Sequence, residues 1–155
     1  MTILYKPLVV IDKPSPISGR LFCKETIDQL VEDVNSKDLK VLGELDVSQN
    51  GAINTKRVSH MINELYIEND MLMAKIKVLE TPMGEILQQL LDVGVEVDLC
   101  MRGVGTLSED NEVTEFKFIT ADVIANHGDP LLSMVYQAGP IDPLVFRSLR
   151  EDGLL

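Results

Sequence analysis

Apolar residues recur at helical spacing in two stretches of the chain. In the first, residues 24 to 35, acidic side chains fill one face and apolar side chains the other: Ile27, Leu30, Val31 and Val34. In the second, Thr81 is placed as an N-cap, Pro82 begins the first turn, and Gly94 follows the apolar run as a left-handed C-terminal cap. Both patterns predict amphipathic helices packed on a core.

Alternating or β-prone runs predict strands elsewhere. Pro7 interrupts the run from 3 to 11, removes a ladder donor and so confines that strand to an edge or a bulge. Residues 58 to 67 and 71 to 79 flank the turn "END" as a hairpin. Further strands are predicted over 39 to 45, 95 to 102 and 113 to 125, with a glycine- and acid-rich turn over 102 to 112.

The order of these elements predicts an α+β fold with a mostly antiparallel β-sheet, or a partly closed barrel, flanked by two or three helices. A parallel βαβ arrangement is the weaker alternative, since one helix alone is clearly bracketed by strands. The 155 residues are expected to form a single domain, with an extended N-terminal arm (1–20) and a C-terminal tail (128–155) that carries a short third helix.

Composition narrows the class of partner. A formal net charge of -11 repels phosphate backbones and anionic lipid surfaces, so we expect neither nucleic acid nor a membrane as a partner. No apolar run reaches the roughly 18 residues of a membrane span. Cys23 and Cys100 show no metal-ligand spacing, and no glycine-rich phosphate loop follows a strand, so no metal and no cofactor is expected.

Four strings keep one order along the chain: "LGELD" (42 to 46), "RVSHMINELYIENDMLMAKIKVLETPMG" (57 to 84), "LLDVGVEVD" (90 to 98) and "RGVGTL" (102 to 107). Together they resemble the prohead core proteases of tailed phages, the capsid-maturation serine proteases whose fold is similar to herpesvirus assemblin. The likeness runs from about Val41 to Pro130, well over half the chain. It implies a β-barrel-like protease that digests scaffold and trims capsid proteins inside an immature head.

The resemblance also implies where catalytic residues belong. In the family, a histidine follows "GEL" in a pattern like GEL-[D/N]-H-P; here the string is "GELDVS", so Val47 occupies the histidine position. The family serine opens S-x-R-G, and here "CMRG" puts Cys100 at that position, with Arg102 on the oxyanion side. A nucleophile needs a base within hydrogen-bond reach, and valine cannot accept a proton.

Other residues bear on the reactivity of Cys100. Strand periodicity places it on a polar face with Glu96 and Asp98, whose negative charge disfavours a thiolate. Two histidines remain as candidate bases, His60 at the start of a hairpin strand and His127 in the turn "NHGDP". A structural role is the preferred interpretation for both, and His127 is the better candidate for a migrated base.

The leading hypothesis is a phage head-assembly protein with a prohead-protease-like fold that has lost peptidase activity and acts by binding, as a structural or regulatory capsid component. Its partners would be capsid, scaffold or protease-paralogue proteins, in a homo- or hetero-oligomer, in the host cytoplasm during assembly or in the virion. Two alternatives stay open. One is an active maturation protease that uses Cys100; the other is a tail-tube-like or unrelated small binding domain.

Overall fold

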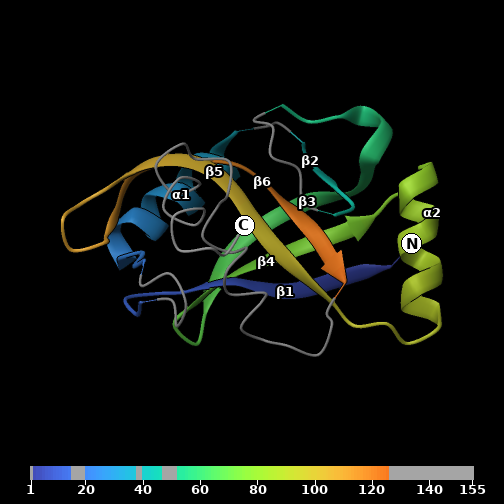
Figure 1. Ribbon diagram of the computed structural model, residues 1–155, viewed down its shortest axis with the longest axis horizontal. Helices are drawn as coiled ribbons and strands as arrows, with labels where there is room; N and C mark the ends of the chain where they lie inside the picture. Colours follow the sequence, from blue (N-terminus) through green and yellow to red (C-terminus); the bar gives the residue numbers. More distant parts are fainter. Residues whose placement is uncertain (1, 15–19, 38–39, 47–51, 126–155) are drawn as a thin grey trace.

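The computed structural model describes residues 2–14, 20–37, 40–46 and 52–125 of the chain. Within them, β1, β4, β3 and β2 form a four-stranded antiparallel sheet in that order, and β5 and β6 form a long antiparallel pair that crosses in front of it (Figure 1). The elements in chain order are β1 (Ile3–Val10), α1 (Lys24–Ser36), β2 (Val41–Glu44), the short 3₁₀ helix η1 (Thr55–Arg57), β3 (Val58–Glu68), β4 (Met71–Val78), α2 (Pro82–Asp92), β5 (Val97–Leu107) and β6 (Val113–Ala125).

The predicted α+β class is therefore observed, with mostly antiparallel pairing and two α-helices among the described residues. Parallel pairing appears there only as two isolated bridges, Leu21 with Glu112 and Leu45 with Val123. The predicted tail (128–155) and its helix lie outside the described residues. Of the predicted arm (1–20), residues 3 to 10 form β1. No described helix has both the length and the apolar content to cross a lipid bilayer.

The apolar core lies between the two sheets and beneath the helices. Along β4 burial alternates strictly, and Leu72, Ala74 and Ile76 are fully enclosed. Leu99 and Met101 of β5 and Ile27 of α1 belong to the same cluster of buried side chains. Because the burial of apolar area contributes roughly 25 cal/mol per Å², this shared cluster is what holds sheets and helices together.

The edge position predicted for the strand that contains Pro7 is confirmed. β1 is the outermost strand of the four-stranded sheet, and its register with β4 shifts between Pro7 and Val9. The predicted hairpin is also confirmed: Asn69 and Asp70 both adopt positive φ between β3 and β4, as a two-residue type I′ turn requires.

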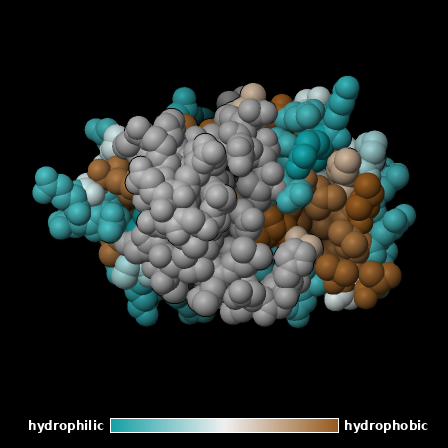
Figure 2. Space-filling model, in the orientation of Figure 1, coloured by the Kyte–Doolittle hydropathy of each residue, from teal (hydrophilic) through white to brown (hydrophobic). Residues whose placement is uncertain are grey.

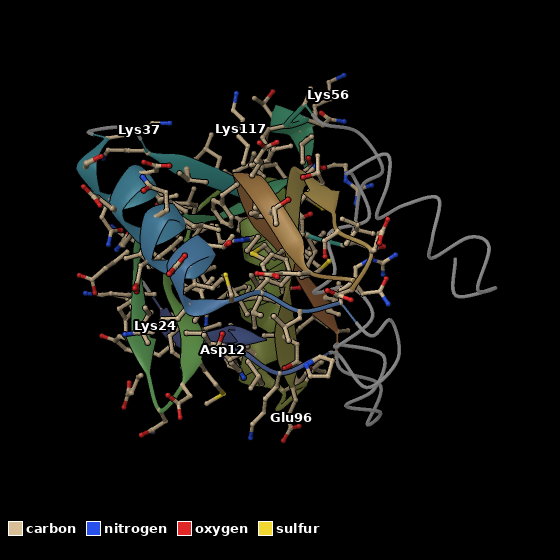
Figure 3. The ribbon with its side chains drawn as sticks, turned by 90° about the vertical axis from the view of Figure 1, so that its left-hand side faces the viewer. Asp12, Lys24, Lys37, Lys56, Glu96 and Lys117 are labelled. Atoms are coloured by element: carbon tan, nitrogen blue, oxygen red, sulfur yellow. The ribbon has the colours of Figure 1, made fainter. Side chains whose placement is uncertain are left out.

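Both helix starts are fixed by side-chain acceptors. The Thr81 hydroxyl accepts a 3.0 Å hydrogen bond from the backbone N–H of Gly84, and Gly94 adopts φ +87° past the end of α2, as predicted. At α1 the acceptor comes from further away, because Asp12 Oδ1 accepts from the backbone N–H of Lys24 at 3.0 Å. Asp12 lies near the N-terminal end of α1 in Figure 3.

The C-terminal end of α1 is tied to β3 by one side chain. The Asn35 amide donates to the carbonyl of Leu65 at 2.8 Å and accepts from the N–H of Leu65 at 3.2 Å. β2 pairs with β3 only as far as Ile62, opposite Val41, so Leu65 lies beyond the end of the neighbouring strand. Asn35 therefore satisfies backbone groups that β2 does not reach.

The turn predicted over 102 to 112 is wrong in its extent. β5 continues to Leu107, and the turn is confined to residues 108 to 112, where Asn111 adopts positive φ. Gly103 lies within the strand for a packing reason: a Cβ there would meet the ring of Phe116 at 2.3 Å and the carbonyl oxygen of Lys117 at 2.6 Å. The glycine permits a close approach of β6 rather than a turn.

Candidate active site

Two of the predicted site residues lie on β5 and face β6. Cys100 is the register partner of Asp122, and Arg102 is the register partner of Thr120. Val47 and His127 lie outside the described residues. Asp46, which precedes Val47, donates its backbone N–H to the carbonyl of Val123 at 2.7 Å. The chain leading into position 47 is thus held against β6, one residue from Asp122.

Cys100 is fully buried, with its Sγ 3.9 Å from the carbonyl oxygen of Met101. Burial raises the pKa of its thiol well above the ordinary value, and the negative charge of Asp122 raises it further. Arg102 opposes this shift and Asp46 adds to it. The thiol is therefore held in its protonated, weakly nucleophilic form.

The source of this effect differs from the sequence-based expectation. Glu96 and Asp98 were predicted to crowd the thiol, because they share its side of the strand. The acids that raise the pKa of Cys100 are instead Asp122, across the strand pair, and Asp46, two residues past the end of β2. The polar face of β5 is also not solvent-facing at this point, since Cys100 and Arg102 are both fully buried.

A charge cluster, defined here as Glu44, Arg102 and Asp122, lies beside the thiol. Arg102 Nη2 donates to Glu44 Oε2 and to Asp122 Oδ1, both at 2.9 Å, and all three side chains are inaccessible to solvent. The three residues come from β2, β5 and β6, so the cluster connects the two sheets. By contrast, Lys24, Lys56 and Glu96 lie at the periphery of the molecule (Figure 3).

Glu44 has further partners beyond the charge cluster. Its Oε2 also accepts from the backbone N–H of Asn54 at 3.2 Å, and its Oε1 lies 3.1 Å from Nε of the partly exposed Arg57. Its backbone N–H donates to Asp122 Oδ1 at 3.1 Å. A buried carboxylate needs several such partners to offset the loss of hydration.

The burial of the Asp122 carboxylate is less well compensated by polar partners than that of Glu44. Burial raises its pKa to about 7, although Arg102 and the backbone N–H of Glu44 lower it. Among the described residues, its Oδ2 has no hydrogen-bond partner. Sequence reasoning did not single out Asp122; the available signal is a lone carboxylate inside the apolar run "FITADVIA", and Glu44 in "VLGEL" has the same signature.

His60 has both ring nitrogens engaged. Nε2 donates to the carbonyl of Ala121 at 2.7 Å, which leaves Nδ1 to accept from the Ser59 hydroxyl at 2.8 Å. Burial lowers the pKa of His60 to about 4, and the bond to Ala121 only partly opposes this. Gly43 packs so close that a Cβ there would lie 2.0 Å from Nε2. The ring is neutral and locked in place, as expected of a structural histidine.

The site brings three charged side chains together but contains no activated nucleophile among the described residues. Arg102, at the position predicted to lie on the oxyanion side, directs Nη2 at two carboxylates. In the described part of the chain, no three His, Cys, Asp or Glu side chains gather in a group that could hold a metal ion.

Comparison with known proteins shows which protein family and which solved structure the chain resembles. A family model described as "Prohead core protein serine protease" matches residues 10–131. A search of curated proteins gives no significant match. Among solved structures, the chain is similar to the bacteriophage T4 capsid assembly protease, gp21, with 19% sequence identity and a TM-score of 0.67 over 79% of this chain and 80% of that chain.

Proposed function

Because the chain belongs to the prohead core protein serine protease family, we propose that it is a phage head-assembly protein that binds other head proteins and has lost the family's peptidase activity. The family resemblance inferred from the sequence is confirmed by the family match and by the fold shared with the phage T4 capsid protease. Membership supports a role in capsid assembly. The proposed loss of peptidase activity needs separate support from the residues of the candidate site.

One observation carries the proposal: the thiol of Cys100 is buried and protonated. The family resemblance implies that Cys100 stands at the serine position and the aliphatic Val47 at the histidine position. The pKa of Cys100 is raised by burial and by Asp122, so the fraction of reactive thiolate at neutral pH is small. Val47 cannot take up a proton. The loss of one member of a nucleophile–base pair removes nearly the whole catalytic effect.

Two other candidate catalytic side chains, His60 and Arg102, make contacts that stabilise the fold. His60 is bonded through both ring nitrogens, and its pKa of about 4 leaves it neutral at physiological pH. Arg102 connects two buried carboxylates, and its displacement toward an oxyanion would leave both without that cation. His127 stays a candidate base from the sequence alone. These contacts support a site in which formerly catalytic positions maintain the fold.

The proposal also includes a partly closed barrel and a place of action in the host cell. A partly closed barrel similar to herpesvirus assemblin is supported by the bridge between Leu45 and Val123, which joins one edge of the four-stranded sheet to β6. We further propose that the protein works in the host cell during head assembly as a capsid component or as a regulator of an active paralogue, in an oligomer with scaffold or capsid proteins.

Cleavage of a phage scaffold protein tests the proposal. The purified protein and its Cys100→Ala variant are incubated with scaffold, and the products are followed by mass spectrometry. We expect scaffold to remain intact with both proteins. A Val47→His, Cys100→Ser double variant, which restores both residue types of the family pattern, is the matched control. Cleavage by the natural chain that disappears in Cys100→Ala would show an active protease.

Thiol alkylation gives an independent test of the same site. Cys23 is only partly buried and serves as an internal control for Cys100. With iodoacetamide at pH 8, we expect alkylation of Cys23 in the folded protein, and alkylation of Cys100 only after unfolding in urea. Modification of Cys100 in the folded protein at a rate equal to that of Cys23 would contradict the proposal.

A further inference from the structure

One flank of α2 is apolar. Residues spaced by three and four positions align along this flank and define the α2 stripe: Met83, Ile86, Leu90 and the C-cap residue Val93. Met83 and Leu90 are half-buried, and the exposed positions beside the stripe are polar: Glu85, Gln89 and Asp92. Ile86 is 43% exposed and Val93 is 77% exposed. The opposite side packs inward through Gly84 and Leu87. Hydrophobic residues gather at the end of the molecule where α2 lies (Figure 2).

The chain segment that carries this stripe has charges of one sign. From Val78 to Met101 the chain contains no lysine and no arginine, although the whole chain has 14 such residues. The same stretch has five acidic residues, of which four are exposed: Glu80, Glu85, Asp92 and Glu96. The α2 stripe thus lies on a chain segment whose charged side chains are all acidic; η1, which packs against α2, adds the basic residues Lys56 and Arg57, of which Arg57 is paired with Glu44.

We propose that the α2 stripe is the docking surface for a cationic amphipathic helix of another head protein. The inference rests on the proposed function, because a head protein that has lost peptidase chemistry must act through such contacts. Apolar residues of the partner would bury Ile86 and Val93, and its lysines or arginines would pair with acids such as Asp92. An amphipathic helix that lies against an apolar surface is a common mode of peptide recognition, and complementary charge fixes its orientation and selectivity.

The charge distribution argues against a second copy as the occupant. Two copies that met through their α2 stripes would bring Glu85 and Asp92 of each against the same acids of the other. No lysine or arginine lies between positions 78 and 101 to offset that repulsion, and of the two basic residues on the adjacent η1, Arg57 is already paired with Glu44. Like charges placed together across an interface disfavour association. A partner of opposite charge is therefore the occupant that this surface fits.

A synthetic peptide tests the chemistry directly. The probe is a fluorescein-labelled helical peptide with leucines at positions i, i+3, i+4 and i+7 and lysines on both sides of that row. The control peptide has glutamates in place of the lysines. We expect the full chain to bind the lysine peptide by fluorescence anisotropy, with affinity that falls as salt rises, and the glutamate peptide about tenfold more weakly or worse.

Variants locate the binding surface. An Ile86→Gln, Val93→Gln double variant should weaken binding of the lysine peptide about tenfold or more, because central apolar contacts dominate such interfaces. Asp92→Lys should weaken it about threefold or more. Two matched controls should bind normally: Glu32→Lys on α1, which makes the same charge change, and Val104→Gln on β5, where the native side chain is 40% exposed.

Other outcomes overturn either the inference or the proposed function on which it rests. Absence of binding, equal binding of the glutamate peptide, or binding that the α2 variants leave unchanged would show that the stripe is not this docking surface. A dimer seen by sedimentation that the Ile86→Gln, Val93→Gln variant dissociates would identify a second copy as the occupant. Cleavage of the bound peptide, checked by mass spectrometry, would contradict the proposed function while leaving the docking surface intact.

Discussion

Strands β4 and β5 look alike in sequence and differ in environment. Apolar residues alternate with polar ones over positions 74 to 78 of β4 and over positions 97 to 102 of β5. In β4 the alternation matches burial: Leu72, Ala74 and Ile76 are enclosed, while Lys75 and Lys77 are only partly buried. In β5 the residues from Leu99 to Gly103 are all buried, on both faces of the strand.

The difference teaches that the two-residue period identifies faces but not which face meets water. The apolar face of each strand packs into the core. The second face of β4 stays partly open, whereas that of β5 is enclosed together with Glu44 and Asp122, whose charges meet Arg102. A polar face can be buried when its charges find partners on other strands. Changes at matched positions on the two strands measure how much this enclosure matters.

The largest expected effect follows from Arg102→Met, which keeps an unbranched side chain of similar length and removes the charge. Glu44 and Asp122 would then remain buried without the cation that they share. Uncompensated buried charges typically cost about 3 to 5 kcal/mol. We expect the free energy of unfolding, measured by urea denaturation at pH 7, to fall by about 3 kcal/mol, since Arg57 still contacts Glu44. A loss below about 1 kcal/mol would mean that the charge cluster is not a structural tie.

Gly103→Ala probes the close approach of β6 to β5. The added Cβ would lie 2.6 Å from the carbonyl oxygen of Lys117, so the backbone must move. Overpacking of this kind costs about 1 to 3 kcal/mol. The matched change is Gly94→Ala, whose Cβ would meet nothing within 4 Å and whose cost of about 1 kcal/mol arises from φ +87° alone. Equal unfolding midpoints for Gly103→Ala and the natural chain would contradict the packing argument.

The pH dependence of stability reports on Asp122. Its pKa of about 7 in the folded protein exceeds the ordinary value of about 4, so between these limits the folded chain holds a proton that the unfolded chain releases. Its contribution to the free energy of unfolding is therefore greatest below about pH 4 and falls as pH rises to 7, by at most about 1.4 kcal/mol per pH unit.

The difference between the natural chain and Asp122→Asn isolates this effect, measured by urea denaturation from pH 4 to pH 8. His60 contributes with the opposite sign: its lowered pKa of about 4 means that its stabilisation is lost as pH falls from about 6.5 to 4. Because both proteins contain His60, that contribution cancels. A difference that does not vary with pH would show that Asp122 keeps its charge throughout the range.

The smallest effect is expected on β4. Lys75→Met removes a cation from the partly open face, where Lys75 Nζ lies 5.9 Å from the centre of the Tyr5 ring. Cation–π contacts at exposed sites contribute about 0.5 to 1 kcal/mol, and the added methionine surface offsets part of that loss. We expect a change in the free energy of unfolding within about 0.5 kcal/mol, measured beside Arg102→Met. A loss equal to that of Arg102→Met would remove the distinction between the two strands.

Local features of the fold were predictable because local chemistry determines them. Thr81 and Gly94 bracket α2, the positive-φ pair Asn69–Asp70 makes the hairpin turn, and Pro7 marks an edge. Each is set by a few neighbouring residues. The resemblance to the family, carried by ordered strings over half the chain, was likewise visible in the sequence.

The charge cluster was not predictable, because its members come from strands far apart in the sequence. Glu44 and Arg102 are separated by 58 positions, and Arg102 and Asp122 by 20. Periodicity assigned Arg102 to a polar face without indicating that two carboxylates would meet it there. The prediction of a turn directly after Arg102 was wrong for a similar reason. Gly103 is required by its close contact with the ring of Phe116, and no local sequence pattern reveals that contact.

The paired hydrogen bonds between Asn35 and Leu65 have one more consequence. Past the end of β2, the rim of β3 would offer a carbonyl and an N–H to any extended chain that came near, and such rims seed aggregation. The carboxamide of Asn35 imitates a peptide group and blocks that template. A single side-chain amide thereby protects this part of β3 from pairing with a strand of another molecule.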